Sequence, residues 1–191
     1  MQSIESDLDV ECELEICSDI CFEIVKRASN GFVYSEAVVS HYIRQLLQAL
    51  ECVHNAGFIH RDIRPHNIVL TSRDNSAPLK LRGFNVAAKI VDCKTKISGG
   101  RIGVAQFMAP EVSSYDNYGT AADIWSTGIV LHLLLSGRLP FQTSPSNIAD
   151  QIKFERYMLT SPSLKRISGQ ARDLMARMLI FDEERRITAK E

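Results

Sequence analysis

The stretch FIHRDIRPHNIVL, residues 58–70, places acidic, basic and amide side chains between two apolar runs. It contains His60, the pair Arg61 and Asp62, and then Arg64 and Asn67. Charged side chains seldom gather where a chain would otherwise build its core, so this concentration indicates a catalytic loop. A loop of this kind needs rigid elements to hold it and further groups to complete its site.

The elements that would hold the loop can be predicted from the hydrophobic pattern. The clearest helix spans residues 35–57, directly before the loop, where Ser35 can cap its start and Gly57 ends it. Two short β-like runs follow at 67–70 and 79–81, and the turn-rich stretch between them predicts a hairpin. The apolar side chains of the long helix recur at helical spacing, at Val38, Val39, Tyr42, Leu46, Leu47 and Leu50.

Further helices are predicted on both sides of this unit. Residues 21–28 carry apolar side chains at helical spacing, and residues 147–158 and 168–179 are amphipathic. Residues 120–137 are apolar nearly all round, which is typical of a central buried helix. The expected fold class is therefore mainly α with one small β-hairpin.

The composition limits the class of protein. With 191 residues, 45% hydrophobic and 24% charged, the chain suits one domain with a sizeable core. The net charge of −1 gives no reason to expect a nucleic acid or an anionic membrane as partner. The longest apolar run, 129–135, is too short to span a bilayer, and the acidic N-terminus does not read as a signal peptide. The five Cys form no zinc set, so reduced thiols are expected.

The motif HRDIRPHN, residues 60–67, resembles the catalytic loop of protein kinases, H-R-D-L-x-x-x-N. Further kinase landmarks follow in the family's order: GFN at 83–85 in place of D-F-G, APE at 109–111, DIW at 123–125, and Arg186. Coincidence does not explain such an ordered set. The chain therefore resembles a protein kinase from about residue 18 onward.

The amino-acid sequences of two segments narrow the resemblance to the calmodulin-dependent kinase group. CFEIVKRASNGFVYSEAVVSHYIRQ and NSAPLKLRGFNVA are similar to the kinase-like domain of the CASK family, the calcium/calmodulin-dependent serine protein kinases. These are scaffolds of the membrane-associated guanylate kinase family, and they too carry a Gly where D-F-G has its metal-binding Asp. The resemblance implies a protein-kinase-like fold, of which only the C-terminal, helical lobe is represented.

The resemblance assigns catalytic roles to three side chains of the loop. Asp62 would orient the substrate hydroxyl and accept its proton. Arg64 stands where kinases commonly carry a Lys that contacts the γ-phosphate, and it would deliver the same charge through a forked group. Asn67 would ligate a metal ion weakly through its amide oxygen.

Five further residues receive supporting roles from the resemblance. His60 would fix the loop by packing and hydrogen bonding. Arg61 would pair with a phosphate or an acid on the activation segment, the stretch between GFN and APE. Asp123 would accept backbone N–H bonds from the loop, and Glu111 would form a buried ion pair with Arg186.

Three departures from the kinase pattern lie close to this machinery. Asn67 and Gly83 hold the cofactor-binding positions, but Gly83 has no side chain, so the Mg²⁺ ligand of D-F-G is lost. Asn85 replaces the Gly of that motif and tolerates a left-handed turn. Val104 replaces a Thr whose hydroxyl bridges the catalytic Asp and its neighbouring Lys. ATP is the cofactor that the resemblance implies, and these departures weaken the case for Mg²⁺.

The sequence contains no Gly-rich phosphate loop and no V-A-I-K strand, the nucleotide-holding groups of an N-terminal lobe. We divide the chain into a divergent acidic segment, residues 1–17, and a kinase-like C-terminal lobe, residues 18–191, that stops before the family's last helix. The chain as given is expected to bind no cofactor.

Two functional classes remain open: a pseudokinase scaffold module, or an active ATP-dependent Ser/Thr protein kinase in a longer native form. A truncation product without function is the plainest alternative. Protein partners are expected, as is self-association through apolar residues around the hairpin, Ile68, Leu70 and Leu79, which an N-terminal lobe would cover. The expected location is cytoplasmic, at cell junctions or the plasma membrane through partners, without direct membrane insertion.

Overall fold

The computed structural model describes residues 18–92, 94–114, 117–143, 145, 150, 153–154, 157 and 161–191. The amphipathic helix expected at 147–158 lies largely outside these residues. The described part is mainly helical with two small sheets, so the expected fold class is confirmed at this level.

The helices agree closely with the hydrophobic pattern. α1 (Ile20–Ser29), α2 (Glu36–Asn55), α4 (Ala121–Ser136) and α6 (Gly169–Met178) correspond to the four predicted segments that lie within the described residues. Ser35 stands at the N-cap of α2 but makes no side-chain cap bond there, whereas Asp19 caps α1 by accepting from the Phe22 N–H at 2.9 Å. The short helix α3 (Pro110–Ser113) was not predicted.

The predicted hairpin is confirmed and is larger than expected. β3 (Ile68–Leu70) pairs antiparallel with β4 (Leu79–Leu81), and β1 (Ser18–Asp19) adds a third strand on the other side of β3. A second, two-stranded sheet joins β2 (Phe58–Ile59) to β5 (Ala88–Lys89). These extra strands are two residues long, too short for an alternation of apolar and polar residues to reveal them.

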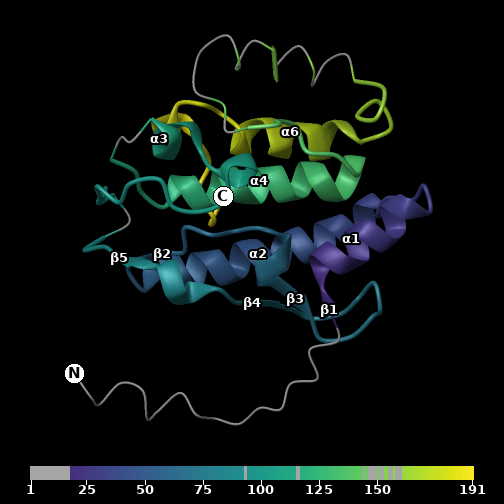
Figure 1. Cartoon of the computed structure of the whole chain (residues 1–191), viewed down its shortest axis with the longest axis horizontal. Coiled ribbons are helices and arrows are strands. Elements are labelled where there is room, and N and C mark those ends of the chain that lie inside the picture. Colours follow the sequence, from purple (N-terminus) through teal and green to yellow (C-terminus); the bar gives the residue numbers. More distant parts are fainter. Residues whose placement is uncertain are drawn as a thin grey trace.

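α4 is the centre of the molecule, as predicted. It lies between α2 and α6, with β3 and β4 on the far side of α2 (Figure 1). Its side chains are buried nearly all round, and Trp125, Ile129 and Val130 are fully buried. Within the described residues, no helix is both long and apolar enough to cross a membrane. α4 therefore supplies a rigid core element against which a site can be held.

The expected exposure of the hairpin is wrong for two of its three apolar residues. Ile68 and Leu70 are 0% and 2% exposed, and Leu79 is partly buried. The reason is that β1 and α1 cover β3, with Ile20 fully buried in the same core. The large apolar side chains that are exposed lie elsewhere.

His132 is a polar group that α4 buries completely. Its Nδ1 lies 2.8 Å from the Arg138 carbonyl oxygen, to which it must donate, and its Nε2 lies 3.1 Å from the Tyr157 hydroxyl. Burial lowers the pKa of the His132 ring from 6.5 to about 4. The folded protein therefore holds this ring neutral.

The neutral His132 ring predicts that stability declines in mild acid. Between pH 6.5 and about 4 the unfolded chain binds a proton that the folded chain does not. The free energy of unfolding therefore decreases as the pH is lowered through this range, by about 3 kcal/mol at most. Urea titrations at pH 7 and pH 4.5 measure this loss. His132→Gln should reduce it, whereas His41→Gln at an exposed histidine should leave it intact; an equal loss in all three proteins would contradict the assignment.

Candidate functional site

The carboxylate of Asp123 holds the catalytic loop by its backbone. It accepts the N–H groups of His60 and Arg61, each at 2.9 Å, so the two bonds expected for it are present. A third partner was not predicted: His54, whose Nε2 lies 2.8 Å from Oδ2 and donates to it. Asp123 is 1% exposed, and it lies in the first turn of α4, where the helix dipole favours an anion.

His60 fixes the loop from the inside. Its ring is fully buried and accepts the Asp62 N–H at Nδ1, 3.2 Å away, while Nε2 donates to the Arg82 carbonyl at 2.9 Å. The ring also meets Phe84 edge to face at 4.6 Å between centroids. One nitrogen accepts and the other donates, so the ring is neutral, and this arrangement suits the supporting role expected for it.

Asp62, Arg64 and Asn67, the three candidate catalytic residues, lie together. Arg64 Nε donates to the Asp62 carboxylate at 3.1 Å. Asn67 Nδ2 lies 2.7 Å from both the Asp62 carbonyl oxygen and Oδ2. The carboxylate that would receive a substrate proton therefore already accepts hydrogen bonds from two neighbouring side chains.

Gly83 lies directly against Asn67. Its φ is +88°, in the left-handed region, and a Cβ built there would fall 2.6 Å from Asn67 Cγ. Real Cβ atoms do not approach this closely, so a side chain at position 83 requires Asn67 to move. The Asn67 amide fills the space that the first atom of a metal-ligating side chain at position 83 would occupy.

The donor set does not fit Mg²⁺. Asn67 supplies one neutral amide oxygen, and Gly83 supplies no side chain, whereas Mg²⁺ prefers several hard oxygens in an octahedron. Among the described residues, no group of three or more His, Cys, Asp or Glu could hold a metal ion. Val104 carries no hydroxyl. The site therefore offers Asp62 as the only carboxylate of the loop itself.

Arg61 reaches the activation segment but meets no acid there. Its Nε donates to the Val86 carbonyl, and Nη1 lies 3.5 Å from the Tyr118 hydroxyl. Its backbone is left-handed, with φ +70°, which is unusual for a residue other than glycine. In the described part of the chain these partners are neutral, so a phosphate or acid as its partner stays a prediction.

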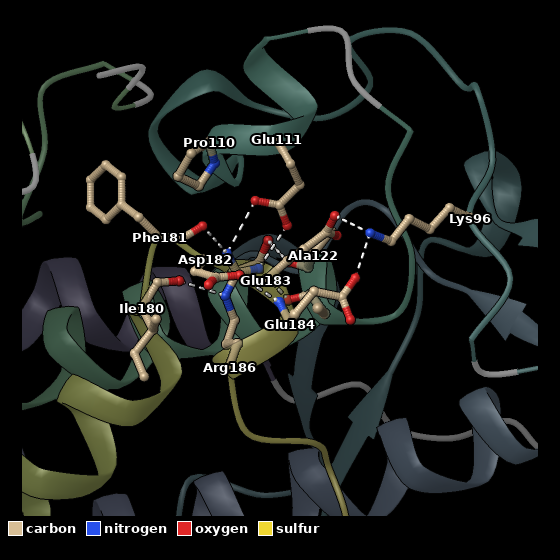
Figure 2. A network of polar contacts seen from close by, with 12 residues as sticks. Lys96, Pro110, Glu111, Ala122, Ile180, Phe181, Asp182, Glu183, Glu184 and Arg186 are labelled. Carbon is tan, nitrogen blue, oxygen red and sulfur yellow. Dashed lines mark hydrogen bonds and ion pairs between the residues drawn. The ribbon is translucent and has the colours of Figure 1, made fainter. Parts of the chain in front are cut away.

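Glu111 and Arg186 form the buried ion pair that the motif predicts (Figure 2). The two groups meet through paired bonds of 2.7 and 3.1 Å. Arg186 also donates to the carbonyls of Ala121, Ile180 and Phe181. The pair thus fastens α3 to the start of α4 and to residues 180–181 after α6, and the remaining donors of Arg186 are satisfied.

Lys96 was not singled out by sequence reasoning. Its Nζ lies 2.6 Å from a carboxylate oxygen of both Glu183 and Glu184 (Figure 2). These hydrogen bonds hold the pKa of Lys96 above its usual value. Eighty-seven residues separate Lys96 from Glu183, and no motif or periodicity relates them.

Comparison with known proteins agrees with these observations. The protein kinase domain family matches residues 3–191. Protein lin-2 of Caenorhabditis elegans, the CASK orthologue, is 54% identical over 178 residues, which are 91% of this chain and 18% of lin-2. The chain therefore spans about a fifth of that relative's length. The predicted resemblance to protein kinases and to the CASK family is confirmed.

The three bonds to Asp123 predict a large effect of its removal. Asp123→Ala should lower the free energy of unfolding by about 3 kcal/mol, because three buried donors would lose their acceptor. Chemical denaturation measures this change. Asp173→Ala, at an exposed aspartate of α6, is the control and should change stability by less than about 0.5 kcal/mol. Similar values for the two variants would show that Asp123 does not hold the loop.

Proposed function

The chain belongs to the protein kinase domain family, and from that premise we propose that it is a degenerate, CASK-like kinase lobe that acts as a protein-binding scaffold module. The described helices and small sheets would form the C-terminal lobe of the kinase fold.

The contact between Gly83 and Asn67 carries the proposal. Phosphoryl transfer depends on metal ions that bridge the phosphates and neutralise the developing charge. At position 83 this chain has no carboxylate, and the Asn67 amide fills the space where such a side chain would begin. A second anionic ligand beside Asn67 would therefore need both a substitution and a rearrangement.

The remaining loop groups bind one another instead of presenting themselves to a nucleotide. Arg64 pairs with Asp62, and Asn67 donates to the same carboxylate. Val104 offers no hydroxyl to continue this network. Any phosphate would have to compete with Asp62 for Arg64, and both side chains are partly exposed to water, which weakens such a contact.

Exposed apolar side chains support a binding role. Phe22 and Val25 lie one turn apart on α1 and are 59% and 61% exposed. Phe32 and Val33, in the loop that follows α1, are 67% and 49% exposed. Large apolar side chains in water favour association with a protein or with a second copy. The proposed partners are therefore proteins, and the proposed location is cytoplasmic, at junctions or membranes through those partners.

An active Ser/Thr kinase in a longer native form is the second candidate. The observation that favours it is the intact scaffold of the loop: Asp62 is held beside Asn67, and Asp123 and the Glu111–Arg186 pair fix the surroundings. ATP is the cofactor that membership of the kinase family implies. Nucleotide binding therefore separates the two candidates.

We expect the chain to show almost no response to ATP. A Kd of 1 mM requires about 4 kcal/mol, whereas one exposed cation contributes at most about 1 kcal/mol. Thermal melts with about 5 mM ATP, with and without Mg²⁺, should shift the melting temperature by less than about 1 °C. A reproducible rise of about 2–4 °C that Asn67→Ala abolishes would contradict the scaffold proposal and favour the kinase.

The packing at Gly83 can be tested separately. Gly83→Ala should destabilise the protein by about 2 kcal/mol, because both the left-handed backbone and the Asn67 amide oppose a Cβ. Gly31→Ala is the matched control: φ is +75°, but nothing lies within 4 Å of its Cβ position. The difference between the two free energies of unfolding reports the Asn67 contact. Equal values would show that position 83 is not filled.

A further inference from the structure

The ion pair between Lys96 and the C-terminal turn joins two distant parts of the chain. Lys96 belongs to the segment before APE, and Glu183 and Glu184 belong to the single-turn helix Glu183–Arg185. Figure 2 shows the ammonium between the two carboxylates, each 2.6 Å away. The Glu183 side chain is 17% exposed and that of Lys96 is 38% exposed, so water covers part of the contact.

Residues beside Lys96 make the contacts that close this segment over the catalytic loop. Ile97 exchanges two backbone hydrogen bonds with Tyr118, at 2.9 and 3.1 Å. Gly99 lies against Arg61, since a Cβ there would fall 2.9 Å from Nη1. The Tyr118 hydroxyl lies 3.4 Å from the Gly100 carbonyl. A displacement of Lys96 would therefore disturb the contact between Gly99 and the Arg61 side chain.

The C-terminal turn is a firm anchor for Lys96. Arg186, directly after the turn, is buried against Glu111 and donates to the Ala121 carbonyl at the start of α4. The Lys94 side chain, two residues before Lys96, makes no ion pair within the described residues. Among the described residues, the Lys96 ion pair is thus a strong electrostatic tie between this segment and the body of the protein.

We propose that Lys96 is an electrostatic latch that ties residues 94–101 to the turn at Glu183 and Glu184 and so keeps this segment closed over Arg61. Loss of the ammonium charge leaves two adjacent carboxylates that repel each other, one of them largely covered. The segment then keeps the Ile97–Tyr118 pairing and the contacts at Gly99 and Gly100 but loses this ion pair, and it opens more often. The inference holds whether or not the chain transfers phosphate.

Hydrogen exchange of the Ile97 and Tyr118 amides, followed by NMR, measures this opening directly. Lys96→Gln should accelerate the exchange of both amides about 3–5-fold, which is the effect expected when one charge of a partly exposed ion pair is removed. Lys94→Gln is the matched control and should leave both rates unchanged. The Ile129 amide, in the buried centre of α4, should keep its rate in every variant.

A charge reversal and a salt titration sharpen the test. Lys96→Glu should accelerate the exchange further, and the added pair Glu183→Lys and Glu184→Lys should restore it. Raising NaCl from about 0.05 to 0.5 M should accelerate exchange in the native protein and change it little in Lys96→Gln. Unchanged Ile97 and Tyr118 rates in Lys96→Gln would overturn the latch. Equal acceleration at Ile129 would overturn it too, because it would mark a general loss of stability.

Discussion

The buried carboxylate of Asp123 is the constraint on which the candidate site depends. An ionised group at 1% exposure is tolerated only when its acceptor positions are filled, and here three donors from the helix before the loop and from the loop itself fill them. This requirement runs in both directions. The donors fix the carboxylate, and the carboxylate fixes the left-handed turn at Arg61 that a non-glycine residue adopts reluctantly.

A second network, around Glu111 and Arg186, also holds the start of α4. Arg186 binds Glu111 with two parallel bonds and reaches the Ala121 carbonyl, two residues before Asp123. The start of α4 thus lies between the buried Asp123 carboxylate and the buried Arg186 guanidinium, each with its hydrogen-bond partners in place. Removing the partners of either group would leave an uncompensated charge inside the protein. The two networks therefore oppose a rearrangement of the backbone around the loop. The geometry of Asp62 follows from this frame.

Much of this frame could be predicted, because it rests on patterns that are local in sequence. The spacing of apolar residues revealed four helices, and the ordered motifs indicated Asp123, Glu111 and Arg186. Contacts that depend on the folded path could not be predicted. Lys96 meets Glu183 only through the three-dimensional course of the activation segment, and the burial of Ile68 depends on a two-residue strand, β1. The clash that a side chain at position 83 would make with Asn67 depends on the φ angle of Gly83, which residue type alone does not determine.

The buried polar groups around the loop and a metal ligand at position 83 differ in whether they stabilise the protein when no nucleotide is bound. The side chains of His60, Asp123, Glu111 and Arg186 all have their partners inside the protein, so the fold keeps them whether or not a nucleotide binds. A metal ligand at position 83 stabilises nothing in the unliganded chain; a carboxylate beside Asp62 would instead add repulsion between like charges. With Gly there, Asn67 relaxes into the space and donates to Asp62. Gly83 therefore suits the unliganded fold, in which the Asn67 amide and the Asp62 carboxylate bind each other.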